Sequence, residues 1–152
     1  MFKSLVILSL LPLAVSFPSL PIGYQQSYAV KGVLLCNGVP SVSTRVKLYD
    51  DDTGPDLDDL MDENITDTKG LFLLSGSETE FLTIDPKLNV YHDCNQANIS
   101  KERHFETDCL KRFEIYLPKE LVTYGNIPQN VYDVGTLHLD QKFEGESYHC
   151  MY

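Results

Sequence analysis

The sequence predicts an all-β fold, an antiparallel β-sandwich built from seven short strands. Three observations lead to this class: apolar residues alternate with a period of two over several short segments, turn-forming residues separate those segments, and no stretch has the longer period of a helix. Strands that follow one another without intervening helices pack as two antiparallel sheets, and nothing here resembles a βαβ unit. The 152 residues contain no internal repeat, so we expect one folded domain.

The strands are expected in the following order. The first spans 28–36, is apolar on both faces and ends at a turn formed by Asn37 and Gly38. The second, 44–50, places Val46 and Leu48 on one face and is half exposed. After an acidic loop, the next strand is an irregular edge strand. The acidic loop spans 50–59, and the edge strand spans 57–63 and continues into 64–68. The remaining four strands are expected at 71–75, within 84–94 after an Asp85-Pro86 turn, at 112–117 and at 131–139.

The N-terminus has the pattern of a secretory signal peptide. A lysine precedes the apolar run 5–15, and small residues follow it, so we expect residues 1–16 to be cleaved after Ser16. The run is too short to cross a membrane, and no second apolar run has that length. Residues 17–27 combine prolines, a glycine and glutamines without periodicity, which predicts a flexible lead-in to a domain at 28–152. The mature protein is therefore expected to be secreted, without a transmembrane segment.

The chain is strongly acidic, with 12 Lys and Arg against 22 Asp and Glu and a formal net charge of −10. Loss of the signal peptide removes one lysine and makes the charge more negative. Such a surface repels nucleic acid and anionic membranes at long range while favouring solubility. A nucleic-acid partner is not expected.

Four cysteines, Cys36, Cys94, Cys109 and Cys150, lie in the expected mature part. An even number in an exported chain predicts two disulfides, with three possible pairings. We expect Cys94 to pair with Cys109, closing a local excursion, and Cys36 to pair with Cys150, tying the first strand to the C-terminus. The alternative, a zinc site, is disfavoured because no C-x-x-C pair is present. No cofactor is expected.

Several segments carry a resemblance to a known family when taken in order. They are VLLCNGVP at 33–40, VKLY at 46–49, LDDLM at 57–61, TDTKGLF at 66–72, SG at 75–76, IDP at 84–86, YHDC at 91–94, IYLP at 115–118, YDVGTL at 132–137 and GES at 145–147, with a final cysteine at 150. A chain with these segments resembles the nematode transthyretin-like family. The resemblance implies a secreted, prealbumin-like sandwich of seven or eight strands.

The resemblance also implies a function that varies between members, some of which act as extracellular binding or bridging molecules. We therefore expect a non-enzymatic interaction protein whose partner is an extracellular receptor or a phospholipid surface. The alternative is an oligomeric carrier of a small apolar ligand, and oligomeric state is not predicted. A related class that hydrolyses 5-hydroxyisourate ends in Tyr-Arg-Gly-Ser, whereas this chain ends with 147–152, SYHCMY, so hydrolase activity is disfavoured.

Catalytic and metal-binding patterns are weak. Asp50, Asp52 and Gly54 have a D-x-D-x-G spacing that suits calcium, but Met61 stands where an EF-hand loop needs its glutamate, which favours a solvated acidic loop. The fragment 145–149 lacks the second glycine of a nucleophile elbow and is interpreted as tail. No catalytic residue is therefore predicted. Four scattered histidines, His92, His104, His138 and His149, suit ordinary roles, and we expect His92 and His138 to be hydrogen-bonded within strands.

Two surface features remain as candidate sites. Lys101, Arg103, Lys111 and Arg112 form a basic patch that suits anionic lipid head groups or a phosphate, although such charges also keep the edge of a sheet soluble. Two sequons predict N-glycosylation near turns, at Asn64 and Asn98.

Overall fold

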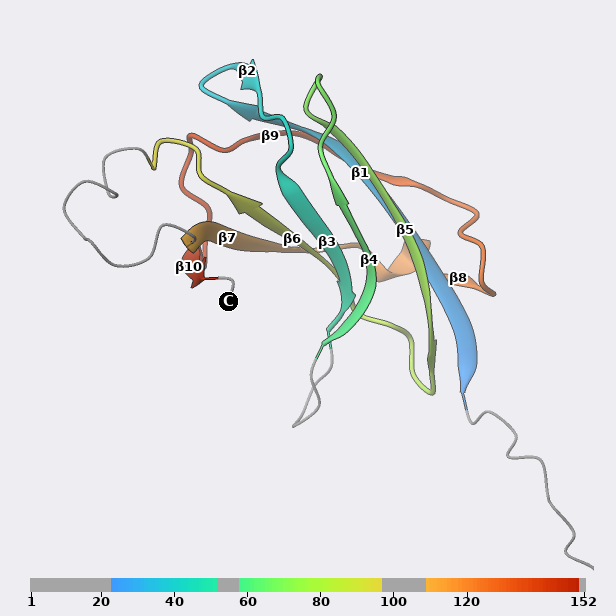
Figure 1. The fold of residues 1–152 in the computed structure, drawn as a ribbon. Coiled ribbons are helices and arrows are strands. Elements are labelled where there is room, and N and C mark those ends of the chain that lie inside the picture. Colours follow the sequence, from blue (N-terminus) through green and yellow to red (C-terminus); the bar gives the residue numbers. More distant parts are fainter. Residues whose placement is uncertain (1–22, 52–57, 97–108, 151–152) are drawn as a thin grey trace, which may run out of the picture.

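The computed structural model describes residues 23–51, 58–96 and 109–150, which form two facing β-sheets (Figure 1). The all-β sandwich expected from the sequence is confirmed. In chain order the elements are β1 (Tyr24–Cys36), β2 (Val39–Pro40), β3 (Arg45–Asp50), β4 (Asp59–Ile65), β5 (Leu71–Glu80), β6 (Pro86–His92), β7 (Cys109–Tyr116), a 3₁₀ helix (Lys119–Leu121), β8 (Thr123–Tyr124), β9 (Tyr132–His138) and β10 (Ser147–Cys150).

The first sheet, called sheet A below, is organised by β1. This strand pairs antiparallel with β5, from Tyr24 opposite Glu80 to Val33 opposite Leu71. The short strands β2 and β8 also pair antiparallel with β1, whereas β9 runs parallel to it. Because β1 is thirteen residues long, it spans the whole molecule and carries segments from both chain halves (Figure 1).

The second sheet, sheet B, has the order β10-β7-β6-β3-β4, and all its neighbours are antiparallel. Its central strand, β6, is buried along its whole length, as expected of a strand with neighbours on both sides and a covered outer face. In β3, buried and half-buried residues alternate strictly. The irregular edge strand expected after the acidic loop is β4, which pairs with β3 through a register shift.

The core lies between the two sheets and follows from the alternation of side chains. Inward-facing residues of both sheets meet in one cluster. Its central members are Val30, Leu34, Phe72 and Leu74 from sheet A and Val46, Leu48, Leu88, Val90 and Phe113 from sheet B. The ring of Phe113 stacks on Phe143 with centroids 3.7 Å apart, so the loop before β10 also closes over the core.

The first strand begins earlier than the sequence suggests. Residues 24–27, expected in a flexible lead-in, belong to β1. Gln26 explains the difference: its amide donates a hydrogen bond of 2.6 Å to the Leu82 carbonyl, and its Oε1 accepts one of 3.2 Å from the Ile84 N–H. A glutamine that resembles lead-in composition is buried here because it satisfies backbone groups of the β5–β6 connection.

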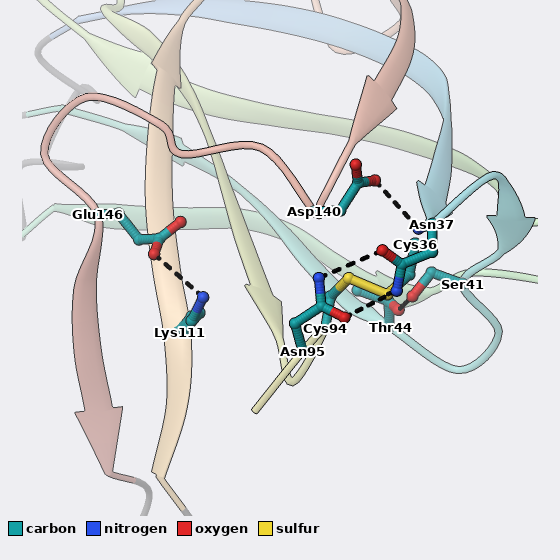
Figure 2. The surroundings of a disulfide bond; sticks show 9 residues. All are labelled: Cys36, Asn37, Ser41, Thr44, Cys94, Asn95, Lys111, Asp140 and Glu146. Atoms are coloured by element: carbon teal, nitrogen blue, oxygen red, sulfur yellow. Dashed lines mark hydrogen bonds and ion pairs between the residues drawn. A yellow bond between two sulfur atoms is a disulfide. The ribbon is translucent and has the colours of Figure 1, made fainter. Parts of the chain in front are cut away.

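The disulfides are two in number, as expected, but their pairing differs from the prediction. Cys36 is bonded to Cys94, with Cα atoms 5.7 Å apart, and Cys109 to Cys150, with Cα atoms 3.9 Å apart. The expected Cys94–Cys109 bond would have closed a local excursion and the expected Cys36–Cys150 bond would have tied the first strand to the C-terminus, whereas the fold brings the ends of β1 and β6 together across the sandwich. The first bond lies beside two mutually bonded asparagines, Asn37 and Asn95 (Figure 2).

The second disulfide follows from a strand that the sequence did not reveal. The segment interpreted as tail forms β10, which pairs with β7 so that Cys150 lies directly opposite Cys109. Side chains of opposite residues in an antiparallel pair are close enough for a disulfide. The tail interpretation of 145–149 is therefore wrong for its last three residues.

Candidate functional site

The described half of the basic patch is neutralised within the protein. Lys111 Nζ lies 3.4 Å from a carboxylate oxygen of Glu146, drawn in Figure 2, and Arg112 pairs with Glu114 on its own strand. Lys101 and Arg103 lie outside the described residues. Since both described cations already have carboxylate partners, the patch offers less positive charge to an anionic ligand than the sequence suggests.

The acidic loop is anchored by a buried lysine. Lys87, with a side chain 4% exposed, contacts Asp51 directly and places Nζ 2.7 Å from Asp58 and 3.6 Å from Glu114. Burial alone lowers the pKa of Lys87, but the hydrogen bonds to the two aspartates outweigh it and hold that pKa above its ordinary value. Correspondingly, Lys87 lowers the pKa of Asp51 despite the burial of that carboxyl. We call these four residues the Lys87 cluster.

The Lys87 cluster bears on the calcium hypothesis. Asp50 is buried, and its Oδ1 accepts a hydrogen bond of 2.6 Å from the Asp85 N–H. Asp51 is committed to Lys87, while Asp52 and Gly54 lie outside the described residues. Within residues 23–51, 58–96 and 109–150, no three His, Cys, Asp or Glu side chains are arranged to hold a metal. The described carboxylates beside the loop thus neutralise a lysine and close the base of the loop.

The three histidines in the described part of the chain do not converge on one site. His92 is buried in β6, and no described residue forms a hydrogen bond with either of its ring nitrogens. Its ring packs edge-on against Phe113, and burial lowers its pKa, an effect that the nearby Glu146 partly offsets. His138 is exposed in β9, His149 contacts the ring of Tyr91, and His104 lies outside the described residues.

The two sequons have different outcomes. Asn64 is exposed near the end of β4, while the hydroxyl of Thr66 in the same sequon is buried, donating to the Ser41 carbonyl at 2.6 Å and accepting from the Thr44 N–H at 2.8 Å. Asn98 lies outside the described residues. Asn64 is thus on a strand of the sandwich, close to the turn that leads to β5.

An exposed apolar surface at one end of sheet A was not predicted. We call it the apolar rim; it consists of Tyr24, Phe81, Leu82, Tyr124 and Ile127, which include the two most exposed large apolar side chains described, Leu82 at 81% and Ile127 at 74%.

Hydrogen bonds place these segments together. The Gln26 side chain bonds the Leu82 carbonyl, and the Gly125 N–H bonds the Gln25 carbonyl at 2.7 Å, so the first residues of β1 lie between the β5–β6 turn and the β8–β9 loop. Tyr24 and Tyr124 share the face of Gln26, because Tyr24 is two residues before it and Tyr124 is its partner in the register. An exposed apolar surface of this kind typically marks an interaction site.

One sequence signal could have indicated the rim. Ile127 stands among turn-forming residues, Gly125, Asn126 and Pro128, where no strand can bury it. Phe81 and Leu82, by contrast, look like ordinary core residues in the sequence, and only the end of β5 at Glu80 shows that they lie in a turn.

Comparison with known proteins assigns the chain to a family. A model of the transthyretin-like family matches residues 31–118, which is more than half of the chain. This chain belongs to the transthyretin-like family. Among curated relatives, transthyretin-like protein 33 of Caenorhabditis elegans is 46% identical over 129 residues, covering 85% of each chain. Transthyretin-like protein 5 of the same organism is 44% identical over 131 residues, covering 86% of this chain and 88% of its own.

A solved structure, a 9R-lipoxygenase from Cyanothece, aligns with a TM-score of 0.38 at 16% identity, over 85% of this chain and 18% of the lipoxygenase. The transthyretin-like match includes Lys87, Phe81 and Leu82, whereas Tyr24, Tyr124 and Ile127 lie outside it.

Membership of the transthyretin-like family, together with two disulfides, is consistent with secretion. Among the described residues, no helix has the length and apolarity needed to cross a membrane. The expected signal peptide lies outside those residues.

Proposed function

We propose that this transthyretin-like protein is a non-enzymatic extracellular interaction protein that binds another protein through the apolar rim. The observation that carries the proposal is the rim itself: three segments distant in sequence present large apolar side chains at one end of sheet A. Tyrosine and phenylalanine are enriched at protein interfaces because each combines a large apolar area with few rotatable bonds.

The charges near the rim favour a protein partner over an anionic membrane. Glu78 and Glu80 directly precede the β5–β6 turn, and the cation Lys119 is already paired with Asp85. The whole chain is acidic, and the described cations of the basic patch have carboxylate partners. A complementary partner therefore presents an apolar surface bordered by basic groups.

The non-enzymatic assignment draws on the family and on the roles of the candidate chemical groups. His92, the most deeply buried histidine described, packs against Phe113 instead of facing a substrate, and the Lys87 cluster is closed by its own ion pairs. Residues 147–150, which include His149, form a strand in sheet B whose Cys150 is bonded to Cys109.

A capture experiment tests the proposal. The secreted protein is immobilised, exposed to extracellular fluid from a nematode, cross-linked mildly, and its partners are identified by mass spectrometry. The test variant is Phe81→Ser with Leu82→Ser, and the matched control is Val42→Ser, because Val42 is exposed near the opposite end of β1. Thermal unfolding confirms that both variants fold.

We expect a defined protein to be retained by the wild type and by Val42→Ser and to be reduced at least tenfold with the rim variant. Equal capture by all three forms contradicts the proposal. Binding to phosphatidylserine vesicles instead of a protein supports the lipid alternative, and a concentration-dependent dimer that dissociates on rim substitution, measured by gel filtration, supports the oligomeric carrier.

A further inference from the structure

An open groove crosses the outer face of sheet A, away from the apolar rim. Its volume is about 540 Å³, and its lining includes Asn64 and Ile65 of β4, Leu71 and Leu73 of β5, and Lys31 and Val33 of β1. Leu73 lies opposite Lys31 and Leu71 opposite Val33 in the register, so these side chains share one face of the sheet. The groove therefore has an apolar strip along β5 and β1, with the end of β4 as its wall.

The far side of the groove is polar. Lys31 Nζ lies 3.5 Å from an Asp133 carboxylate oxygen, and both residues line the groove. Ile65, Leu71 and Leu73 are all exposed. An apolar strip with charged hydrogen-bonding groups at one border matches the two faces of a sugar, which carries C–H groups on its ring faces and hydroxyls on its edges.

Asn64 provides the attachment point for such a sugar. It stands in the sequon Asn64-Ile65-Thr66, is exposed, and lines the groove. Its Oδ1 accepts a hydrogen bond of 2.8 Å from the Ile65 N–H, and its Nδ2 donates one of 3.5 Å to the Leu73 carbonyl. Glycosylation uses one of the two N–H groups of the amide, so the other remains able to donate to Leu73.

We propose that Asn64 carries an N-linked glycan whose first sugars lie along this groove and cover Ile65, Leu71 and Leu73. The donor is a lipid pyrophosphate-linked oligosaccharide. The Asn64 amide nitrogen forms a bond to C1 of the first N-acetylglucosamine, the bond from C1 to the pyrophosphate oxygen breaks, and the lipid pyrophosphate leaves with the electron pair. The amide proton passes to a base of the transferase.

The burial of Thr66 sets the timing of this modification. The glycosylating enzyme recognises a sequon through its hydroxyl residue. In the folded protein Thr66 is only 2% exposed, and its hydroxyl donates a hydrogen bond to the Ser41 carbonyl and accepts one from the Thr44 N–H. The glycan must therefore be added before β3 and β4 pair. This order fits a chain that meets the transferase and forms its disulfides along the same export route.

The glycan has a physical role at this position. Residues of β4 and β5, edge strands of the two sheets, face each other here, and the Ser75 N–H is satisfied by Asp62 at 2.8 Å. Exposed apolar side chains beside sheet edges favour association between molecules. A sugar over the groove covers these side chains and leaves the apolar rim as the exposed binding surface.

Mass spectrometry of the protein secreted from insect cells tests the modification. An Asn98→Gln background removes the second sequon, so any glycan reports on Asn64. We expect the peptide that contains Asn64 to be almost fully glycosylated, and Thr66→Ser, which preserves the sequon, to remain glycosylated. A folded, secreted protein with an unmodified Asn64 overturns the proposal.

Hydrophobic dye fluorescence tests where the glycan lies. Enzymatic removal of the glycan leaves aspartate at position 64, and we expect dye fluorescence to rise at least threefold, to the level of a secreted Asn64→Asp variant. The same removal from a Leu73→Ser variant should raise it much less, because the apolar strip is interrupted. A glycosylated Asn64 whose removal leaves dye fluorescence unchanged contradicts the placement in the groove.

Discussion

Replacement of Lys87 by methionine should destabilise the fold more than loss of any exposed lysine. Methionine keeps the apolar stem but removes the charge that holds three carboxylates at the base of the acidic loop. After this replacement Glu114 still has Arg112 as a cationic partner. Asp51 and Asp58 lose their only described cation, although Asp51 still accepts a hydrogen bond of 3.2 Å from the Tyr116 hydroxyl. Removal of one partner from a buried ion pair costs about 3 to 5 kcal/mol, and partial exposure of the aspartates places the expected loss near the lower value.

Urea denaturation at pH 7 measures this loss, since urea does not screen charges as guanidinium salts do. The matched control is Lys31→Met, because Lys31 is 51% exposed and paired with an exposed aspartate, and it should cost at most about 0.5 kcal/mol. Addition of Asp51→Asn to the Lys87 variant should restore part of the stability by removing one of the uncompensated charges.

The same variant has a defined pH dependence. The pKa of Asp51 is lowered in the folded protein, so its stabilising contribution is present above the ordinary carboxyl pKa of about 3.9 and is lost as pH falls through the lower folded value. The difference between wild type and Lys87→Met should therefore shrink on acidification below about pH 4. Two results would contradict this prediction: a loss of unfolding free energy in Lys87→Met that is no larger than in Lys31→Met at pH 7, or a loss that does not change with pH.

Three further predictions follow from single contacts. Replacement of both Cys36 and Cys94 by alanine should lower the free energy of unfolding by about 4 kcal/mol, because the disulfide closes a separation of 58 residues, and non-reducing peptide mapping should find this pair in the wild type. His92→Phe should flatten the fall in stability between pH 6.5 and 5, because the unfolded chain takes up a proton that the buried imidazole resists. The effect at pH 5.5 is at most about 1.4 kcal/mol, which is the value for an imidazole that stays neutral in the folded protein, and Glu146 opposes it. A pH slope equal to that of the wild type would contradict this prediction. Gly76→Ala should cost about 2 kcal/mol in thermal or urea unfolding, because its Cβ would lie 2.4 Å from the backbone oxygen of Met61, and unchanged stability would show that β4 can move away freely.

The strands of the core could be predicted because burial leaves a periodic signal. Val46 and Leu48 alternate with polar residues in β3, and both lie fully buried where the alternation places them. The edge strand β4 was also predicted, although propensity alone did not distinguish it from a helical turn. The four residues of β10 carry no such signal, since their place is determined by pairing with β7.

Long-range partners could not be predicted from the same pattern. Cys36 and Cys94 meet because β1 and β6 end at the same corner of the sandwich, and no local property of either strand encodes that meeting. Lys87 shows the same limit: a lysine within an apolar segment looks like a charged residue on an exposed face, yet it is buried and pairs with carboxylates near both ends of the acidic loop.

Candidate sites were the least predictable features. The four cations of the basic patch are close in sequence, but Lys111 has its carboxylate partner across the strand pair, on the residue before β10. The apolar rim is hard to predict for another reason. Phe81 and Leu82 are residue types typical of a core, and they are exposed because β5 ends at the residue before them.

Hydrogen–deuterium exchange of the complex with the captured partner shows directly whether the apolar rim binds a protein. We expect slower exchange in residues 79–84 and 123–128 on binding, and unchanged exchange at 39–43 near the opposite end of β1. Protection confined to 39–43, or to strands β7 and β10 beside the basic patch, would contradict it.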